Sequence, residues 1–550
     1  FERRLTLESD PYVGDHVFGS IRSPYARGLV ALPVMPGVMT LEMLAQGGLA
    51  VASPDRRASV AAVERLRLHR WLTLDRGFVD LRVSARPSTG ARHKVDVELF
   101  ELDEAAPAGR WAVADATIVV DAAPAQPPQG RRLGGQTIEP RYPLKRFIAE
   151  HIFQGPSLRC FIAPLRMTDQ GIEAEVVVPP RERLYRDDVA PRLATGANLI
   201  DGAGQSVACW LVERWARWDG VFPFYAESYA QFGPLPRPGE RLRCVAFIRD
   251  EGQFASADVE FQRADGSVAC QYRDFRQRRF PITAELAACV GNYDVDCMFT
   301  RPFAAGPGLT GRLFDGAYHD VVRPERAIFL QSIAHSVLTA SEREAWRAIP
   351  QGSPRRAGWL MGRVAAKEAV CTWADERHGL SLSPIDIDIA ADERGKPIVR
   401  LDGAGASIPL PEISISHAET LAIAAAADDA SVGVDVEQTR EGKPRTVPEI
   451  AFAEGELAKA ERTGTPPIAL WCAKEAAAKS LGVGLLGEPR RWRVETLAPD
   501  GRAAVVAIDG LRVHVSLQNH GSGVIAVAQV PRALAMEARA SLRVRADPKG

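Results

Sequence analysis

The chain has 550 residues, which is too long for one hydrophobic core and predicts three or four domain-sized units. Apolar residues make up 46% of it, charged residues 25%, and the formal net charge is -1. This ordinary balance disfavours a nucleic-acid or membrane-surface protein, and no apolar run approaches the roughly 18 residues of a membrane span. Eight dispersed cysteines without a CxxC pair indicate reduced thiols, so we expect a cytoplasmic protein with no nucleic-acid or membrane partner.

Residues 1–121 combine short strand-like runs with one helix. The run Lys94–Leu99 alternates polar and apolar residues, as a half-buried strand does, whereas Gly37 to about Ala50 has apolar residues at helical spacing. A Pro-rich stretch over 122–130 predicts a linker.

Residues 140–282 repeat this pattern. A predicted helix at Leu199–Trp215 is followed by strand-like runs such as Arg241–Ile248. One helix with an antiparallel sheet, given twice, predicts an α+β fold for this half of the chain.

Two segments of this half carry polar residues suited to catalysis. His16 lies in a predicted loop, and Pro36-Gly37 opens the first helix, where free N–H groups and the positive helix dipole would polarise a thioester carbonyl. In the second helix Asp201 and Gln205 are four residues apart on an apolar face. Each has an ordinary alternative: His16 as a surface histidine beside an ordinary capped helix, and Asp201 as a helix-capping residue.

Together these segments resemble the double-hotdog dehydratase domains of polyketide synthases, over roughly residues 1–282. The resemblance rests on Asp15–Gly19, Pro36-Gly37, His151–Pro156 and Asp201–Gln205, although Gly196-Ala197 stands where many members have His-Pro. It implies that His16 removes the α-proton of a β-hydroxyacyl thioester and that a protonated Asp201 donates to the leaving hydroxyl. Gly37, through backbone N–H groups, and Gln205 are the implied substrate-binding residues.

Residues 283–325, rich in Gly, Pro and aromatics, predict a connector, and 326–546 predict a mixed helix and strand domain. Within it the predicted helices Trp359–Trp373 and Ile468–Leu481 share the string Ala-Lys-Glu-Ala. That repeat indicates two pseudo-equivalent halves.

The run Ser431–Glu437 alternates valines with Gly433, Asp435 and Glu437. On a strand this spacing places both carboxylates on one face, where they repel each other unless a cation lies between them. Oxygen ligands of this kind suit Mg²⁺, which takes one or two carboxylates together with substrate phosphates. The alternative is an exposed edge strand with two solvated acids.

Further polar motifs surround this strand in the sequence. Lys474, Glu475 and Lys479 lie on a predicted helix, where Glu475 and Lys479 could instead form a surface ion pair. A Gly395-Lys396-Pro397 turn presents a cation, and Ser414-Ile-Ser416-His417 places a hydroxyl and an imidazole at the end of a strand.

In order and spacing, these motifs resemble the phosphopantetheinyl transferases of the surfactin-synthetase type, from about Arg326 to Val530. The resemblance implies a two-lobed, pseudo-symmetric α+β fold that binds Mg²⁺ through Asp435, Glu437 and Glu475. It also implies that Glu475 is the base and that Lys479 steadies the leaving group, with coenzyme A as donor substrate. The implied coenzyme A ligands are six residues: Arg356, Arg363, Lys396, Ser416, His417 and Lys474.

A dehydratase followed by a phosphopantetheinyl transferase is typical of iterative enediyne-type polyketide synthases. The first residue is Phe1, which suggests a piece of such a longer polypeptide, and the expected partner is its acyl carrier protein domain. Two alternatives remain: a catalytically inactive hotdog scaffold for docking or dimerisation, and the equivalent part of a polyunsaturated fatty acid synthase. A homodimer formed through the dehydratase is a further expectation.

Overall fold

The structure is a computed structural model that describes residues 1–19, 31–53, 58–89, 93–104, 106–121, 125–215, 219–290, 298–321, 327–350, 353–393, 395–401, 408–438 and 449–546. These residues form two compact units, which divide between Tyr293 and Asp294. Over the described ranges, no helix has the length and apolar character needed to cross a membrane.

The N-terminal unit is built on one 11-stranded antiparallel sheet in the order β1-β5-β6-β7-β4-β10-β13-β12-β11-β9-β8. The strands of its first half are β1 (Glu2–Thr6), β4 (Ser59–Leu68), β5 (Phe78–Pro87), β6 (Lys94–Leu102) and β7 (Arg110–Asp121). Those of its second half are β8 (Phe161–Thr168), β9 (Gly171–Val177), β10 (Asp219–Gln231), β11 (Arg241–Asp250), β12 (Phe254–Gln262) and β13 (Val268–Pro281).

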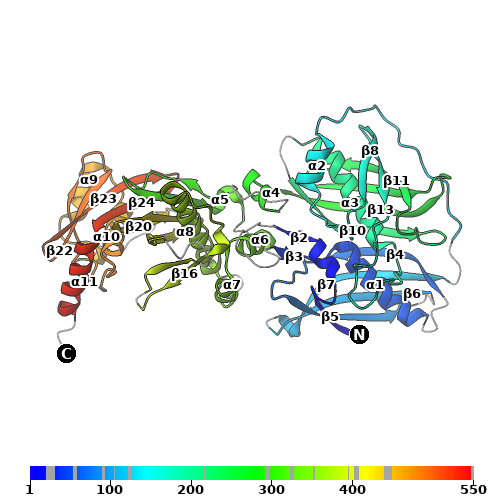
Figure 1. Cartoon of the computed structure of the whole chain (residues 1–550), viewed down its shortest axis with the longest axis horizontal. Helices are drawn as coiled ribbons and strands as arrows, with labels where there is room; N and C mark the ends of the chain where they lie inside the picture. Colours follow the sequence, from blue (N-terminus) through cyan, green and yellow to red (C-terminus); the bar gives the residue numbers. More distant parts are fainter. Residues whose placement is uncertain are drawn as a thin grey trace. The chain divides into compact units, whose positions relative to one another are not determined.

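The same topology occurs twice in this sheet. Helix α1 (Gly37–Ala52) precedes four strands that lie in the order β5-β6-β7-β4, and α3 (Ala197–Val212) precedes four in the order β11-β12-β13-β10. Each helix packs against its own half of the sheet, as Figure 1 shows for α1 on the blue strands and α3 on the cyan and green ones. This repeat confirms the predicted double-hotdog fold.

Three shorter elements complete this unit. They are the hairpin of β2 (Val17–Phe18) and β3 (Leu32–Pro33), and the helices α2 (Leu144–His151) and α4 (Ala284–Val290).

The C-terminal unit has two lobes. The first carries α6 (Ala327–Val337), α7 (Ala340–Arg347) and α8 (Pro354–His378), with α8 on the sheet β14-β15-β19-β18 and beside the hairpin β16-β17. The strands are β14 (Arg301–Pro302), β15 (Leu309–Asp315), β16 (Ile387–Ala391), β17 (Pro397–Leu401), β18 (Glu412–Ala418) and β19 (Leu421–Ala427).

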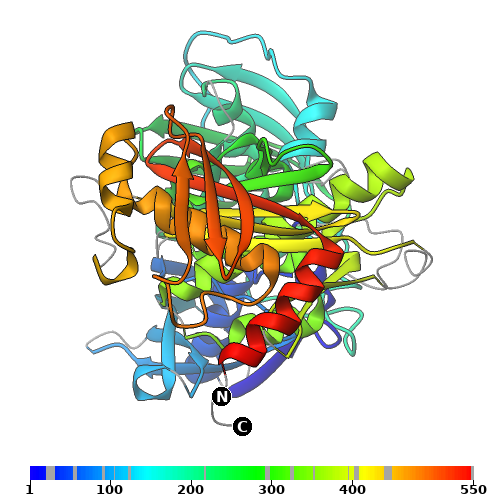
Figure 2. The same cartoon turned by 90° about the vertical axis from the view of Figure 1, so that its left-hand side faces the viewer.

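The second lobe packs α10 (Pro467–Leu481) on the sheet β20-β24-β23-β22-β21. In Figure 2, where this unit faces the viewer, α10 (orange) runs across these strands and α11 (Arg532–Ala546, red) lies beside them. The remaining elements are α9 (Glu456–Thr463), β20 (Ala430–Gln438), β21 (Arg493–Leu497), β22 (Ala503–Ile508), β23 (Leu511–His520) and β24 (Gly523–Pro531).

The connector predicted at 283–325 differs from the observed chain. Its first part forms α4 of the N-terminal unit, whereas β14, β15 and the short helix α5 (Gly316–His319) belong to the first lobe of the C-terminal unit. The difference arises because β15 lies between turn-forming glycines, at Gly306, Gly308 and Gly316, that dominate the local composition. Its backbone nevertheless pairs in full register with β19.

Candidate functional site

Strand β20 and helix α10 approach each other closely at Gly433. A side chain at that position would overlap the backbone of Ala476 and Ser480 on α10, so only glycine allows this packing. Because side chains alternate along a strand, Asp435 and Glu437 lie on the same face as Gly433, whereas Val432, Val434 and Val436 are buried in the core between the lobes. Asp435 is only 5% exposed, which excludes the alternative of a solvated edge carboxylate.

Asp435 joins three elements of the C-terminal unit. Its Oδ1 accepts hydrogen bonds from Ser416 Oγ on β18 (2.8 Å) and from Lys479 Nζ on α10 (2.7 Å). Its second oxygen, Oδ2, is buried without a hydrogen-bond partner. A buried carboxylate oxygen left unpaired costs free energy, and a bound cation would remove that cost.

Glu475, one helical turn before Lys479, feels the neighbouring acids. Burial raises the pKa of Glu475, and the negative charges of Asp435 and Glu437 raise it further. These acids therefore form a negative pole that Lys479 only partly neutralises.

The predicted shell of three carboxylates is not assembled in the structure. Over the described ranges, no three His, Cys, Asp or Glu side chains converge closely enough to hold a metal ion, and Lys479 donates to Asp435 Oδ1. The orphaned Oδ2 and the raised pKa of Glu475 nevertheless fit a hard cation that takes one or two protein carboxylates and completes its shell with phosphate and water. Asp435, Glu437 and Glu475 are the residues that would hold it.

A positive pole lies next to these acids, around His417. The imidazole packs on α8 at Gly358, where an added Cβ would come within 3.0 Å of His417 Nδ1. Partial burial lowers the pKa of His417, and the charges of Lys479, Arg355 and Arg363 lower it further. Three cations therefore lie close enough to His417 to act on its charge, and a cluster of this kind suits a phosphate.

Of the six predicted coenzyme A ligands, Ser416, His417 and Arg363 lie at this positive pole or against Asp435. Ser416 bonds Asp435, and Arg363 lies over the Trp359 ring at 4.3 Å, with burial lowering its pKa. Their contact with coenzyme A stays a prediction.

Two other predicted ligands are held by protein groups. Lys396 Nζ pairs with Glu412 Oε2 at 2.5 Å. Arg356 stacks on Trp346 at 4.0 Å and donates to the carbonyl of Ile349.

Lys474 is a correction to the predicted set. Its ammonium is fully buried and donates to Glu456 Oε2 (2.7 Å), Ala451 O (3.0 Å) and Pro489 O (3.2 Å), so its three N–H groups already have acceptors. A phosphate ligand would need at least one of them. Lys474 is therefore a structural cation in this fold.

The first lobe contains a matching ion pair, which supports this correction. Lys367 on α8 donates to Glu342 and to Val337 O, as Lys474 on α10 does to Glu456 and Ala451 O. Each glutamate also accepts the N–H of a following strand, from Ile389 on β16 and from Val494 on β21. This correspondence supports the pseudo-equivalent halves predicted from the repeated Ala-Lys-Glu-Ala.

In the N-terminal unit, His16 is buried at 7% exposure. Its Nδ1 lies 2.8 Å from the carbonyl oxygen of Val34, which only accepts hydrogen bonds, so Nδ1 carries the proton and Nε2 has a free lone pair. Burial lowers the pKa of His16 to about 4. The imidazole is therefore neutral at neutral pH and able to accept a proton.

Asp201, on the first turns of α3, has the opposite tendency. Burial raises the pKa of Asp201 to about 6, although hydrogen bonds from Gln205 and Gln154 partly offset the increase. The carboxyl thus keeps its proton to a higher pH than an exposed aspartate does. Both residues are buried, so neither is the ordinary surface or capping group of the alternatives.

The segment 154–157 contacts both His16 and Asp201. Asp15 accepts hydrogen bonds from the N–H and hydroxyl of Ser157 at 2.9 and 2.6 Å, and its own carbonyl accepts the Gly155 N–H. His16 then pairs with Gln154 in an isolated β-bridge, while the Gln154 side chain lies within hydrogen-bonding reach of Asp201.

The two predicted substrate-binding residues have different placements. Gly37 is the first residue of α1, as predicted, and its contact with a thioester stays a prediction. Gln205 is buried, and its amide bonds Leu158 O, Asp201 Oδ2 and the N–H groups of Cys160 and Phe161. Because these protein groups already use both its donors and its acceptor, Gln205 positions Asp201 rather than binding substrate.

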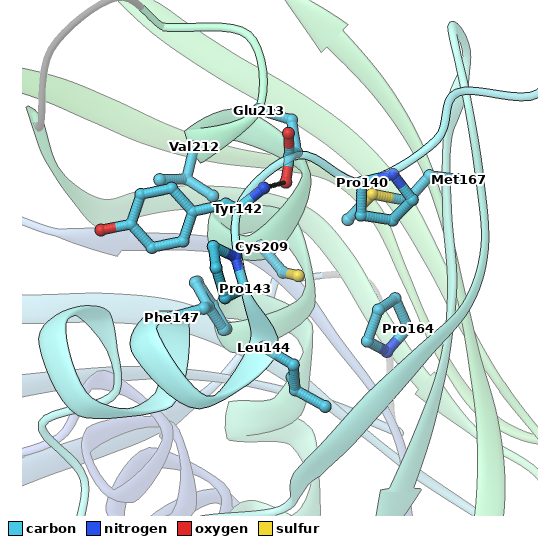
Figure 3. Close-up of a pocket in the computed structure, with 10 residues that line it drawn as sticks. All are labelled: Pro140, Tyr142, Pro143, Leu144, Phe147, Pro164, Met167, Cys209, Val212 and Glu213. Carbon is cyan, nitrogen blue, oxygen red and sulfur yellow. Dashed lines mark hydrogen bonds between the residues drawn. The ribbon is translucent and has the colours of Figure 1, made fainter.

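An apolar pocket of about 280 Å³ lies at the other end of α3 (Figure 3). Its lining is Pro140, Tyr142, Pro143, Leu144, Phe147, Pro164, Met167, Cys209, Val212 and Glu213. The only carboxylate there, Glu213, accepts the backbone N–H groups of Arg141 and Tyr142. Because neither His16 nor Asp201 lines it, this pocket is separate from their site.

The sequence reasoning gave no role to Gln154 or to the counter-ions Glu342 and Glu412. No local motif marks the two counter-ions, because Glu342 lies 25 residues from its partner Lys367 and Glu412 lies 16 residues from its partner Lys396. Gln154 lies farther still from its partner Asp201 in the sequence. Only the repeated Lys of Ala-Lys-Glu-Ala, on two apolar helices, hints that each helix buries a cation needing an acid.

Comparison with known proteins divides along the same two units. The family described as the 4′-phosphopantetheinyl transferase superfamily matches residues 431–529, which include β20 and α10. A holo-[acyl-carrier-protein] synthase of Geobacillus kaustophilus is 35% identical over 109 residues, covering 19% of this chain and 81% of that protein. One from another Geobacillus strain is 37% identical over 110 residues, covering 19% of this chain and 87% of that protein.

Among solved structures, a dehydratase domain of the curacin polyketide synthase covers 51% of this chain and 93% of its own, at 15% identity and a TM-score of 0.39. The dehydratase domain of PpsC from Mycobacterium tuberculosis, solved with C12:1-CoA, covers 51% of this chain and 94% of its own, at 18% identity and a TM-score of 0.38.

Proposed function

The chain belongs, through its C-terminal unit, to the 4′-phosphopantetheinyl transferase superfamily, and we propose that this unit transfers phosphopantetheine from coenzyme A to a serine of an acyl carrier protein. The observation that carries the proposal is the pair of opposite poles around Asp435. The acids at Asp435, which has one unpaired oxygen, lie beside the cations Lys479, Arg355 and Arg363. A diphosphate that binds together with a metal ion needs acids for the metal and cations for its phosphates.

In the proposed reaction the carrier serine oxygen attacks the phosphorus that bears the pantetheine arm. The bond from that phosphorus to the bridging oxygen breaks, and 3′,5′-ADP leaves. Glu475 accepts the hydroxyl proton, because its raised pKa makes it a stronger base than a solvated glutamate. Arg355, Arg363 and Lys479 hold the phosphates in place by charge. Mg²⁺, when bound at Asp435, Glu437 or Glu475, would neutralise charge on the diphosphate.

Intact mass measurement of an apo carrier protein incubated with coenzyme A and Mg²⁺ tests this proposal. We expect a mass increase of one phosphopantetheinyl group, lost in Glu475→Gln and Asp435→Asn. Glu461→Gln, at an exposed position of α9, is the matched control and should retain full activity. Full activity in Glu475→Gln would contradict the assigned base.

We also propose that the N-terminal unit dehydrates β-hydroxyacyl thioesters. His16 Nε2 takes a proton from the carbon next to the thioester carbonyl, the C–O bond at the β-carbon breaks, and the departing oxygen takes the Asp201 proton to form water. The supporting observations are that burial lowers the pKa of His16 to about 4 and raises that of Asp201 to about 6, and that Gln154 contacts both residues.

Incubation with a 3-hydroxyacyl N-acetylcysteamine thioester tests this second activity by the ultraviolet absorbance of the enoyl product. His16→Ala should abolish the product, whereas His69→Ala, at an exposed position of the same unit, should not. A wild-type protein without product would favour the alternative of an inactive hotdog scaffold.

The order of the two units supports a finer proposal: both act within an iterative, enediyne-type polyketide synthase, on a carrier domain of the same polypeptide. Preferential modification of that domain over a fatty-acid carrier protein would support it. Modification of carrier domains from a polyunsaturated fatty acid synthase alone would favour the alternative. Light scattering of the purified chain tests the proposed homodimer.

A further inference from the structure

The segment between the two hotdog halves contains one polar residue, Gln154, that contacts both His16 and Asp201. Gln154 stands opposite His16 in a β-bridge, a pairing that brings the two Cβ atoms to within about 5 Å of each other. Its side-chain amide reaches the Asp201 carboxyl. Gln154 thus contacts both halves of the proposed proton-transfer pair.

The amide of Gln154 is only half satisfied. The residue is 8% exposed, yet its carbonyl oxygen Oε1 is buried and has no hydrogen-bond partner. Gln205, the other amide on Asp201, has protein partners for its donors and its acceptor. A buried, unpaired acceptor costs free energy, so its retention beside two reactive groups indicates a ligand that supplies the missing donor.

We propose that Gln154 is a catalytic residue whose Oε1 accepts a hydrogen bond from the β-hydroxyl of the substrate. This inference rests on the proposed dehydratase activity. A hydroxyl has one proton and two lone pairs. Its proton points to Gln154 Oε1, which leaves a lone pair directed at the protonated Asp201. When the C–O bond breaks, the oxygen takes the Asp201 proton and leaves as water, still bonded to Oε1.

This role also gives the site a means of discrimination. A 3-oxoacyl thioester carries an acceptor where the 3-hydroxyacyl thioester carries a donor, so it would leave Oε1 unpaired and facing a second oxygen. A site built around a hydrogen bond rejects an analogue that lacks it, because the buried polar group then has no partner. Gln154 is therefore expected to select reduced 3-hydroxy substrates over their 3-oxo precursors.

The substitution Gln154→Met, which keeps the length of the side chain but removes its amide, tests the proposal in the full chain. With 3-hydroxyacyl and 3-oxoacyl N-acetylcysteamine thioesters as probes, we expect kcat/KM for dehydration to fall roughly ten- to hundredfold. Inhibition by the 3-oxo compound should become as strong as binding of the 3-hydroxy compound. Gln253→Met, at an exposed position of the same unit, is the matched control and should behave like wild type.

The pH profile separates this role from a purely structural one. Gln154 donates to Asp201, so its loss should raise the pKa of Asp201 and move the high-pH limb of activity upward. The other groups that act on Asp201 are neutral and stay in place: Gln205, Cys160 and Tyr272. A structural defect would lower the rate without shifting this limb.

The outcomes distinguish the two proposals. If wild type forms no enoyl product, the dehydratase assignment fails together with this inference. If wild type is active and Gln154→Met matches it in rate, in discrimination and in pH limb, only the role of Gln154 is overturned. If Gln154→Met does not fold, Gln154→Glu keeps the acceptor but loses the donor, and it should retain preference for the 3-hydroxy compound; loss of that preference would contradict the proposal.

Discussion

At the scale of single residues, Lys479 and Asp435 define how the proposed metal site is held in this structure. The ammonium of Lys479 bonds Asp435 Oδ1, Ser416 Oγ and Val434 O at 2.7, 3.1 and 3.1 Å. It lies where a divalent cation would compete with it for the same carboxylate. Lys479 therefore acts as a counter-ion to Asp435 in this arrangement.

Lys479→Met should separate metal binding from turnover. Without the ammonium, the negative charge of Asp435 is no longer paired, although Ser416 Oγ still donates to Oδ1. The apparent Kd for Mg²⁺ should therefore fall several-fold, as measured by calorimetry. The rate of carrier modification should fall, because the departing 3′,5′-ADP loses a cation. Weaker Mg²⁺ binding in Lys479→Met would show that the lysine supports the metal site instead of competing with it.

Dehydration should have a narrow pH optimum set by His16 and Asp201. Activity needs His16 without its proton, which requires a pH above about 4, and Asp201 with its proton, which requires a pH below about 6. The rate of enoyl formation from a soluble thioester should thus rise through pH 4 and fall through pH 6. Asp201→Asn should abolish enoyl formation at every pH, because an amide cannot supply the proton that the leaving oxygen takes. Full dehydration in that variant would assign the upper limb to another group.

At the scale of secondary-structure elements, a buried Lys–Glu ion pair anchors the main helix of each lobe of the C-terminal unit. Lys367 and Glu342 do this for α8, and Lys474 and Glu456 for α10. At the next position the lobes differ. Glu368 accepts the N–H groups of Phe299 and Thr300, whereas Glu475 belongs to the acidic pole near Asp435. One repeated string thus serves structure in one lobe and the candidate site in the other.

Lys474→Met should lower stability without acting on coenzyme A binding. Removing one partner leaves Glu456 as an uncompensated buried charge, which costs about 3–5 kcal/mol. The double variant Lys474→Met/Glu456→Gln should recover most of this loss, because Gln keeps an acceptor for the Val494 N–H. Thermal unfolding measures the recovery. A raised KM for coenzyme A in the folded double variant would show that Lys474 binds coenzyme A and would contradict this prediction.

The sequence predicts the elements of this chain better than its contacts. The helices at Gly37–Ala52 and Pro467–Leu481 lie where apolar spacing predicts them, because that pattern is local. The same pattern says which face of a strand holds Asp435, but not that Lys479 occupies its oxygen. A local motif predicts that Lys474 binds coenzyme A, but it does not reveal the buried partner Glu456, which lies on another helix. Gln154 needed the three-dimensional bridge to His16 before it had a role.

At the scale of the whole molecule, the two candidate sites lie in separate compact units with separate cores. Among the described residues, those named for each site come from one unit. His16, Gln154 and Asp201 come from the N-terminal sheet and its helices, and Asp435, Glu475 and Lys479 from the second lobe of the C-terminal unit. The proposed transferase and the proposed dehydratase therefore have separate sites in one chain.

The most direct test of these two proposed activities measures both of them on one preparation of the chain and on two variants. Intact mass of a carrier protein follows phosphopantetheine transfer, and enoyl absorbance follows dehydration of a soluble thioester. We expect Glu475→Gln to lose transfer while dehydrating normally, and His16→Ala to lose dehydration while transferring normally. If Glu475→Gln still adds the full phosphopantetheinyl mass at the wild-type rate, the central claim of an acid-built transferase site is wrong.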